Sequence, residues 1–266
     1  MAAKTGMDRA IAIAWHSVRL MVAALAVLVS LPVDAQPNTQ RRDRGGLGIE
    51  FGPVWFSRND VRIPGTTGTE FDMTTLTGSG PEAYFRIDGD WNINEKHGLR
   101  FVLAPLEVSG TGVLVQDTNF NGTTFPAGPT EGTYKFSTYR LTYRYTFYDT
   151  AKWRWRIGFT GLIRDAKIEL SQPGLTAKDT NVGFVPLLHL YGEWAFADRW
   201  GLVFDFDGLA GGPGRAIDAA IKVTFDVSDQ WRIGGGYRTI EGGADTESVY
   251  NFAWLHYGVL TAAWRF

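Results

Sequence analysis

His189 and Asp207 are the two residues whose types and spacing come nearest to a catalytic pair. A tight turn at 197–199 would fold the flanking segments into a hairpin whose register sets His189 opposite Asp207. A carboxylate beside an imidazole orients the ring and strengthens it as a general base. The pair also fits an ion pair in an interior charge network, and we favour this interpretation because such pairs are common in structural networks. No serine shares the strand face of His189, so no nucleophile is visible there.

The stretch DTNFNG, residues 117–122, matches the first half of a calcium-binding loop. Such a loop closes with a glutamate at its twelfth position, where this chain has Gly128. A solvated Asn-Gly turn explains the stretch equally well. The glycine-rich run 234–238 follows no strand–helix pattern and indicates close packing rather than a phosphate site. The sequence therefore predicts no bound metal and no cofactor.

Residues 1–35 have the pattern of a secretory signal peptide. Three basic residues precede the apolar run 20–31, and the small residues Val33 and Ala35 stand just before Gln36. The alternative is a membrane anchor, but a run of 12 residues is short of the roughly 20 that a spanning helix needs. We therefore expect a signal peptide over 1–35 and one exported domain over 36–266.

The composition favours a β-rich domain. The chain is 44% hydrophobic and 14% aromatic, and it has 32 glycines, ten tryptophans and no cysteine. Aromatic residues suit pleated sheets and glycines suit tight turns. The net charge of −2 gives no reason to expect a nucleic-acid partner. Without cysteines, the exported domain is not stabilised by disulfides.

Short segments with a two-residue alternation fill the exported domain. In TYRLTYRYTF, tyrosines, Leu141 and Phe147 share one face, while arginines and threonines share the other. Large aromatic residues thus oppose charged residues, which fits either a membrane barrel or a soluble sheet whose aromatic face is the core. The ten segments are 47–55, 83–91, 99–105, 138–147, 153–161, 187–196, 200–208, 217–227, 231–238 and 257–266. The alternation slips near Glu107 and over 164–167.

The connections favour the barrel. Short connections at 92–98, 148–152, 197–199 and 228–230 alternate with longer ones at 58–80, 115–133, 171–181 and 242–251, and the short stretch 210–214 is the exception. Short turns at one rim, long loops at the other and girdles of tryptophan are typical of barrels that span an outer membrane. The short turns also predict the pairs Phe196–Trp200, Asp90–Arg100 and Asp226–Arg232.

The last segment, YGVLTAAWRF, resembles the terminal strand of bacterial outer-membrane β-barrels, with Trp264 and Phe266 on one face. OmpA-type and OmpW-type barrels are similar in size. The resemblance implies a closed antiparallel transmembrane barrel of about ten strands, with eight or twelve as alternatives. It also implies the outer membrane of a Gram-negative-type bacterium, membrane lipid as a partner, and outer-membrane assembly machinery that reads the strand ending at Phe266.

The inward face of such a barrel decides which functions are plausible. Arginines gather on the fourth and fifth segments and aspartates on the seventh and eighth, so we expect them to pair across a narrow lumen and fill it. We therefore expect a non-enzymatic structural or surface-interaction protein, whose loops 58–80 and 115–133 meet an extracellular ligand. The alternatives are a narrow channel or transporter for a small solute or apolar molecule, and a hydrolase at the rim, similar to omptin proteases, with His189 and Asp207.

Overall fold

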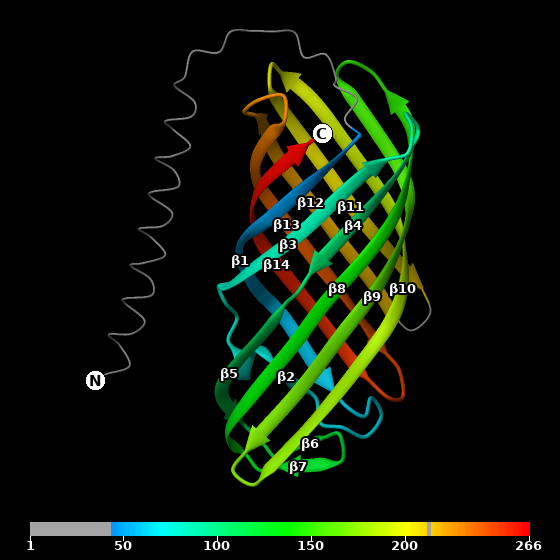
Figure 1. Cartoon of the computed structure of the whole chain (residues 1–266). Helices are drawn as coiled ribbons and strands as arrows, with labels where there is room; N and C mark the ends of the chain where they lie inside the picture. The colour runs from blue at the N-terminus through cyan, green and yellow to red at the C-terminus, as the bar shows by residue number, and fades with distance from the viewer. Residues whose placement is uncertain (1–43, 212–213) are drawn as a thin grey trace, which may run out of the picture. The chain divides into compact units, whose positions relative to one another are not determined.

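A computed structural model of the chain describes residues 44–211 and 214–266, so the predicted signal peptide lies outside the described residues. Most of these residues form one antiparallel sheet that closes on itself, because the last strand pairs with the first. Ten strand positions make the wall (Figure 1). They are β1 (Gly45–Arg62), β3 (Glu82–Asn92), β4 (His97–Ala104) followed by β5 (Glu107–Leu114), β8 (Gly128–Asp149), β9 (Trp153–Gln172), β10 (Leu175–Ala197), β11 (Trp200–Gly211), β12 (Gly214–Asp226), β13 (Trp231–Asp245) and β14 (Tyr250–Arg265).

The two faces of the wall have opposite chemistry. Large apolar side chains such as Leu47, Phe101 and Phe159 point outward and are 54–67% exposed. Charged side chains such as Arg140 and Asp205 point inward and are buried. A soluble sheet would bury its aromatic face and expose its charges, so this distribution excludes the soluble alternative. The fold is the predicted closed transmembrane β-barrel of ten strands.

Aromatic girdles mark the edges of the membrane-facing band. On β14, Trp264 and Trp254 both lie on the outward face and are separated by ten residues, which is about the length of a membrane-spanning strand. Near Trp264 the barrel has its short turns and the described chain ends, and we call this the periplasmic end. There Trp153 stacks on Trp194 with ring centroids 5.2 Å apart. The opposite end is called the outer end.

The short turns fall where the sequence predicts them, at 93–96, 150–152, 198–199 and 227–230. The pairs Asp90–Arg100, Asp226–Arg232 and His189–Asp207 are all present in the sheet. The predicted pair Phe196–Trp200 is wrong. A register shift after Ala195 places Trp200 opposite Ala197, because the turn at 198–199 takes one residue fewer than expected.

Two of the four long connections are shorter than expected. The connection at 171–181 is only Pro173-Gly174, since β9 and β10 continue to either side of it. Gly174 has a φ of 80°, as the third residue of a type II turn requires, and proline is favoured just before it. The connection at 242–251 shrinks to residues 246–249. As a result β8, β9 and β10, with 22, 20 and 23 residues, extend well beyond β11, which has 12.

The predicted slip near Glu107 is confirmed, and the one over 164–167 is not. Pro105, which lacks a backbone N–H, separates β4 from β5. In contrast, β9 is continuous and pairs with β10 in a single register. Within the described residues the only helix is α2 (Thr74–Thr77), and no helix there is long and apolar enough to cross a bilayer.

Candidate functional site

A network of buried ion pairs fills the middle of the barrel. It joins four arginines from β3, β4, β8 and β13 to four carboxylates from β1, β11 and β12, partly across the lumen and partly between neighbouring strands, and each member is at most 7% exposed. Arg140 contacts Asp207 at 3.0 Å and Asp218 at 2.8 Å, and Arg100 contacts Asp205 at 3.0 Å. Buried charges are stable only when they are paired and hydrogen-bonded, which these contacts achieve. The network consists of Arg86, Arg100, Arg140, Arg238, Glu50, Asp205, Asp207 and Asp218.

His189 and Asp207, the pair singled out by the sequence, belong to this network. His189 Nδ1 lies 2.9 Å from Asp207 Oδ1, and Thr160 donates its hydroxyl to the same oxygen at 2.7 Å. The His189 side chain has no exposed surface, and its Nε2 has no hydrogen-bond partner in the described structure. A hydrolase at the rim, one of the alternatives, would need this pair near the outer end, but β10 extends 14 residues beyond His189 in that direction. The geometry favours the structural ion pair.

A second, apolar filling occupies the outer half of the lumen, which the sequence analysis missed. Two connections fold back between the strands, one through α2 and one through the hairpin of β6 (Thr118–Phe120) and β7 (Thr123–Phe125). Met73, Phe120 and Phe125 are fully buried there. We call the two connections, residues 63–81 and 115–127, the plug. Figure 1 shows β6 and β7 at the end opposite the C-terminus.

Glycines on the wall make room for the plug. A Cβ on Gly112 of β5 would lie 1.9 Å from the carbonyl oxygen of Thr75, and one on Gly132 of β8 would lie 2.8 Å from Leu76 Cβ. Any larger residue at these positions would therefore displace α2. Backbone bonds join the two connections as well, from Thr69 N to the Asn119 oxygen at 2.9 Å. The apolar residues Met73, Phe120 and Phe125 within the predicted loops 58–80 and 115–133 were the sequence signal for this plug.

The calcium-like stretch has a structural role in the plug. Asn121 and Gly122 have φ values of 47° and 80° and form the two-residue turn between β6 and β7, as Asn-Gly commonly does in hairpins. Asp117 accepts a hydrogen bond from the backbone N–H of Ala127 at 2.9 Å. In residues 44–211 and 214–266, no three histidine or acidic side chains converge as a metal site would require. The Asn-Gly turn is the interpretation that the structure supports.

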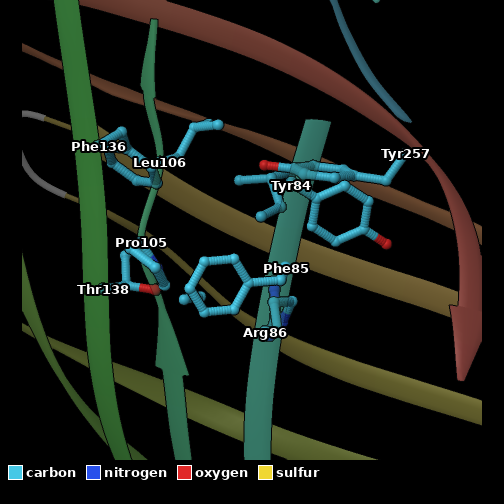
Figure 2. Close-up of a pocket in the computed structure, with 10 residues that line it drawn as sticks. Tyr84, Phe85, Arg86, Pro105, Leu106, Phe136, Thr138 and Tyr257 are labelled. Atoms are coloured by element: carbon cyan, nitrogen blue, oxygen red, sulfur yellow. The ribbon is translucent and has the colours of Figure 1, made fainter. Parts of the chain in front are cut away.

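The barrel wall is interrupted between β3 and β5, and a small pocket lies beside this place. β3 pairs with β4 only from Ile87 onward, and the described sheet contains no ladder between β5 and the preceding part of β3. Figure 2 shows this place: Phe85 of β3 points toward Pro105 and Thr138, and Tyr257 of β14 lies beside Tyr84. Tyr84 and Tyr257 pack edge to face with centroids 4.6 Å apart. The pocket is lined by the lipid-facing Phe85 and by the buried Leu106 and Tyr257.

No protein-family model and no curated protein matches the sequence. Among solved structures, the outer-membrane protease OmpT of Escherichia coli is similar over 88% of this chain and 99% of its own, with 9% identity and a TM-score of 0.46. The attachment invasion locus protein Ail of Yersinia pestis is similar over 84% and 99%, with 10% identity and a TM-score of 0.37. The toluene transporter TodX of P. putida is similar over 87% and 93%, with 10% identity and a TM-score of 0.31.

Proposed function

We propose that this outer-membrane barrel is a structural and surface-interaction protein, not a diffusion pore. The observation that carries this proposal is the double filling of the lumen. Ion pairs occupy its middle, and the apolar plug occupies its outer half. A solute crossing the barrel would have to break buried ion pairs and also move α2, each of which costs several kcal/mol, on the order of 3–5 for one buried pair. The working surfaces are therefore those outside the lumen.

The outer end offers a surface suited to a polypeptide partner. β11 pairs with β10 only from Leu188 onward, so the outer part of β10 has one edge without a strand partner in the described sheet. Asn121 of the plug donates to the carbonyl oxygen of Lys178 at 2.9 Å, so the backbone groups of Lys178 and of alternate residues such as Thr180 face this edge. An extended peptide can add to such an edge through main-chain hydrogen bonds.

Planar-bilayer recording tests the closed lumen. Folded protein reconstituted at the same density as a general diffusion porin should give no steady unitary steps, whereas the porin gives them. Regular steps from the wild-type protein would contradict the proposal, since they require an open path through the ion pairs.

An array of immobilised extended peptides tests the surface role. Thr180→Pro removes one edge-facing N–H without changing the hydrogen bonds to β9, while Thr180→Ala keeps that N–H. We expect peptides that bind the wild type to bind Thr180→Ala equally and Thr180→Pro at least about tenfold more weakly, because one hydrogen bond is lost and an acceptor is left unpaired. If neither substitution changes peptide binding, β10 is not the docking edge.

Passage of a small apolar molecule through the wall is the second candidate, supported by the missing ladder between β3 and β5. A bilayer-soluble photoreactive diazirine tests it. If the interruption admits apolar molecules, the probe should label the inward-facing Leu106 and Tyr257. Lipid-facing Val223 is the positive control and fully buried Phe120 the negative control. Labelling of Val223 without Leu106 or Tyr257 would exclude this route.

A further inference from the structure

The lipid-facing wall carries a hydrogen-bonded chain of a serine, a histidine and a tyrosine. His256 Nε2 lies 2.8 Å from Ser57 Oγ, and His256 Nδ1 lies 2.5 Å from the Tyr237 hydroxyl. Ser57 and Tyr237 are exposed on the outside of the barrel, and His256 is half-buried between them. The three residues come from the adjacent strands β1, β14 and β13. A serine hydroxyl bonded to an imidazole, whose other nitrogen is held by a third group, is the arrangement of a serine hydrolase.

A β-bulge aims the serine at the histidine. Phe56 pairs with Leu255 and Arg58 pairs with Trp254, so Ser57 is an extra residue in β1. The bulge places Ser57 against β14, where its hydroxyl also reaches the carbonyl oxygen of Trp254 at 3.3 Å. Bulges cost ladder hydrogen bonds and are frequent beside active sites, where they redirect one side chain. Without this bulge, Ser57 would occupy an ordinary position in the ladder.

The chain lies at the depth where a lipid ester would be found. His256 is two residues inside Trp254, the aromatic residue at the outer edge of the band on β14, and pairs with the outward Trp55. Girdle aromatics sit at the level of the lipid head groups. The ester bonds of membrane lipids lie directly beneath the head groups, where acyl chains begin. The Ser57 hydroxyl is therefore level with lipid carbonyl groups and open to them from the side.

Groups suited to a lipid head group lie just beyond the serine. The guanidinium groups of Arg58 and Arg215 lie 5.5 and 4.9 Å from the ring centroid of Phe252. Phe252 is two residues from Trp254 on β14, in the direction of the outer end. The side chains of the two arginines are 38% and 44% exposed, and each also pairs with an acid, Asp60 and Glu241. The two arginines thus offer hydrogen-bond donors at head-group level without a net positive charge.

A second histidine–tyrosine pair on the wall differs from the pair of His256 and Tyr237 in having no bond to a serine among the described residues. At the periplasmic end His97 Nδ1 lies 2.6 Å from the Tyr143 hydroxyl, on the same outward face of the wall. Within the part of the chain that the structure describes, His97 bonds no serine, so this pair is explained as part of the aromatic girdle. The pair of Tyr237 and His256 has the additional bond to a bulged serine.

We propose that Ser57 and His256 form an esterase site that hydrolyses carboxylic esters of outer-leaflet lipids, with Tyr237 as a positioning residue. Ser57 Oγ attacks the ester carbonyl carbon while His256 Nε2 takes the hydroxyl proton. The C–O bond to the alcohol then breaks, and the leaving alkoxide receives that proton, which leaves an acyl-serine. Water, deprotonated by His256, attacks the acyl-serine and releases the fatty acid. The sum is one ester and one water converted to one acid and one alcohol.

Covalent labelling with a long-chain fluorophosphonate in detergent micelles tests the site on the folded barrel. The wild type should be labelled at Ser57, as located by mass spectrometry, and Ser57→Ala should not be labelled at this position. His256→Ala should lower the labelling rate by about 10²–10⁴-fold, the usual contribution of a general base. Tyr237→Phe should lower it less and be partly rescued at higher probe concentration. His97→Ala and Ser109→Ala are matched controls with no expected effect, because His97 lacks a serine contact and Ser109 bonds only Thr133.

Two kinds of vesicle identify the lipid. One contains phosphatidylethanolamine and phosphatidylglycerol, and the other contains lipopolysaccharide, and released fatty acid is measured by mass spectrometry. Release from either supports the proposal and names the source of the ester. Three results would overturn it: no release from both vesicles by a barrel shown to be folded, no label at Ser57, or an unchanged labelling rate in His256→Ala.

Discussion

Arg238 has more charged contacts than any other cation that the structure describes in the lumen. Its Nε and Nη2 donate to Glu50 at 2.8 and 3.0 Å, its Nη1 contacts Asp218, and Asp205 lies 3.5 Å away. It is 1% exposed, so water cannot replace these partners. At the scale of single residues, the interior of the barrel therefore depends on shared ion pairs, in which Glu50, Asp205 and Asp218 each contact two or more cations.

Replacing Arg238 by methionine should lower the free energy of unfolding by about 3–5 kcal/mol, because Glu50 and Asp218 lose a buried partner. Urea titration of the protein in lipid vesicles measures this. Arg215→Met is the matched control: its arginine also pairs with a glutamate but is 44% exposed, so its loss should cost less than about 1 kcal/mol. The double variant Glu50→Gln, Arg238→Met should recover part of the loss. Equal effects for Arg238→Met and Arg215→Met would show that the network adds no stability.

At the scale of elements, the plug closes the outer half of the lumen, and the position of α2 within the plug depends on β5. The strand carries Val108 and Leu114 inward, with Gly110 and Gly112 between them, so α2 can approach the backbone closely. Asp72 holds the start of α2 by accepting from the Thr74 N–H at 2.9 Å. The interior is therefore closed by packing between elements that are distant in sequence, not by the barrel wall alone.

Gly112→Val should displace α2, because its Cβ would lie 1.9 Å from the Thr75 oxygen. Overpacking of this kind costs about 1–3 kcal/mol. We expect faster proteolysis within residues 63–81 in the folded protein, measured by mass spectrometry of the fragments. Thr111→Val, on the exposed face of the same strand, should leave the proteolysis rate unchanged. A wild-type rate in Gly112→Val would mean that α2 does not pack against β5.

At the scale of the whole molecule, closure of the barrel between β1 and β14 brings both described chain ends to one rim. β1 pairs with β3 on one side and β14 on the other, so both described chain ends meet at the same rim. Arg44 N and Gly45 N both donate to the carbonyl oxygen of Phe266, at 2.7 and 3.2 Å. In hydrocarbon the backbone groups of a sheet edge need partners, and the pairing of β14 with β1 from Gly46 to Arg62 supplies them along this seam.

Single cysteines test the orientation, since the chain has no native cysteine. Thr124→Cys in the plug and Gln230→Cys in the turn before β13 are both at exposed positions. In intact cells a membrane-impermeant maleimide should label Thr124→Cys and should label Gln230→Cys only after permeabilisation. The reverse pattern would invert the topology, and equal labelling of both would place the protein outside the membrane.

Much of the architecture follows from the sequence alone because it depends on local rules. The two-residue alternation determined the ten strands and their inward charges, and short turns determined registers such as Asp90 with Arg100 and His189 with Asp207. Where a turn took one residue fewer, as at 198–199, the same reasoning misplaced Trp200. Pro173-Gly174 has the residues that a type II turn requires. The two-residue alternation on either side of this turn is too weak to show that β9 and β10 continue up to it.

Only the tertiary structure decided how the lumen is closed and what the outer wall brings together. The plug depends on Met73 and Leu76 meeting glycines of β5 and β8, contacts between segments that no local pattern links. The bond from His256 to Ser57 joins the last strand to the first, 199 residues apart, and exists because the barrel closes with a bulge at that point. Periodicity determines which face a side chain occupies, whereas closure and stagger determine which side chains become neighbours.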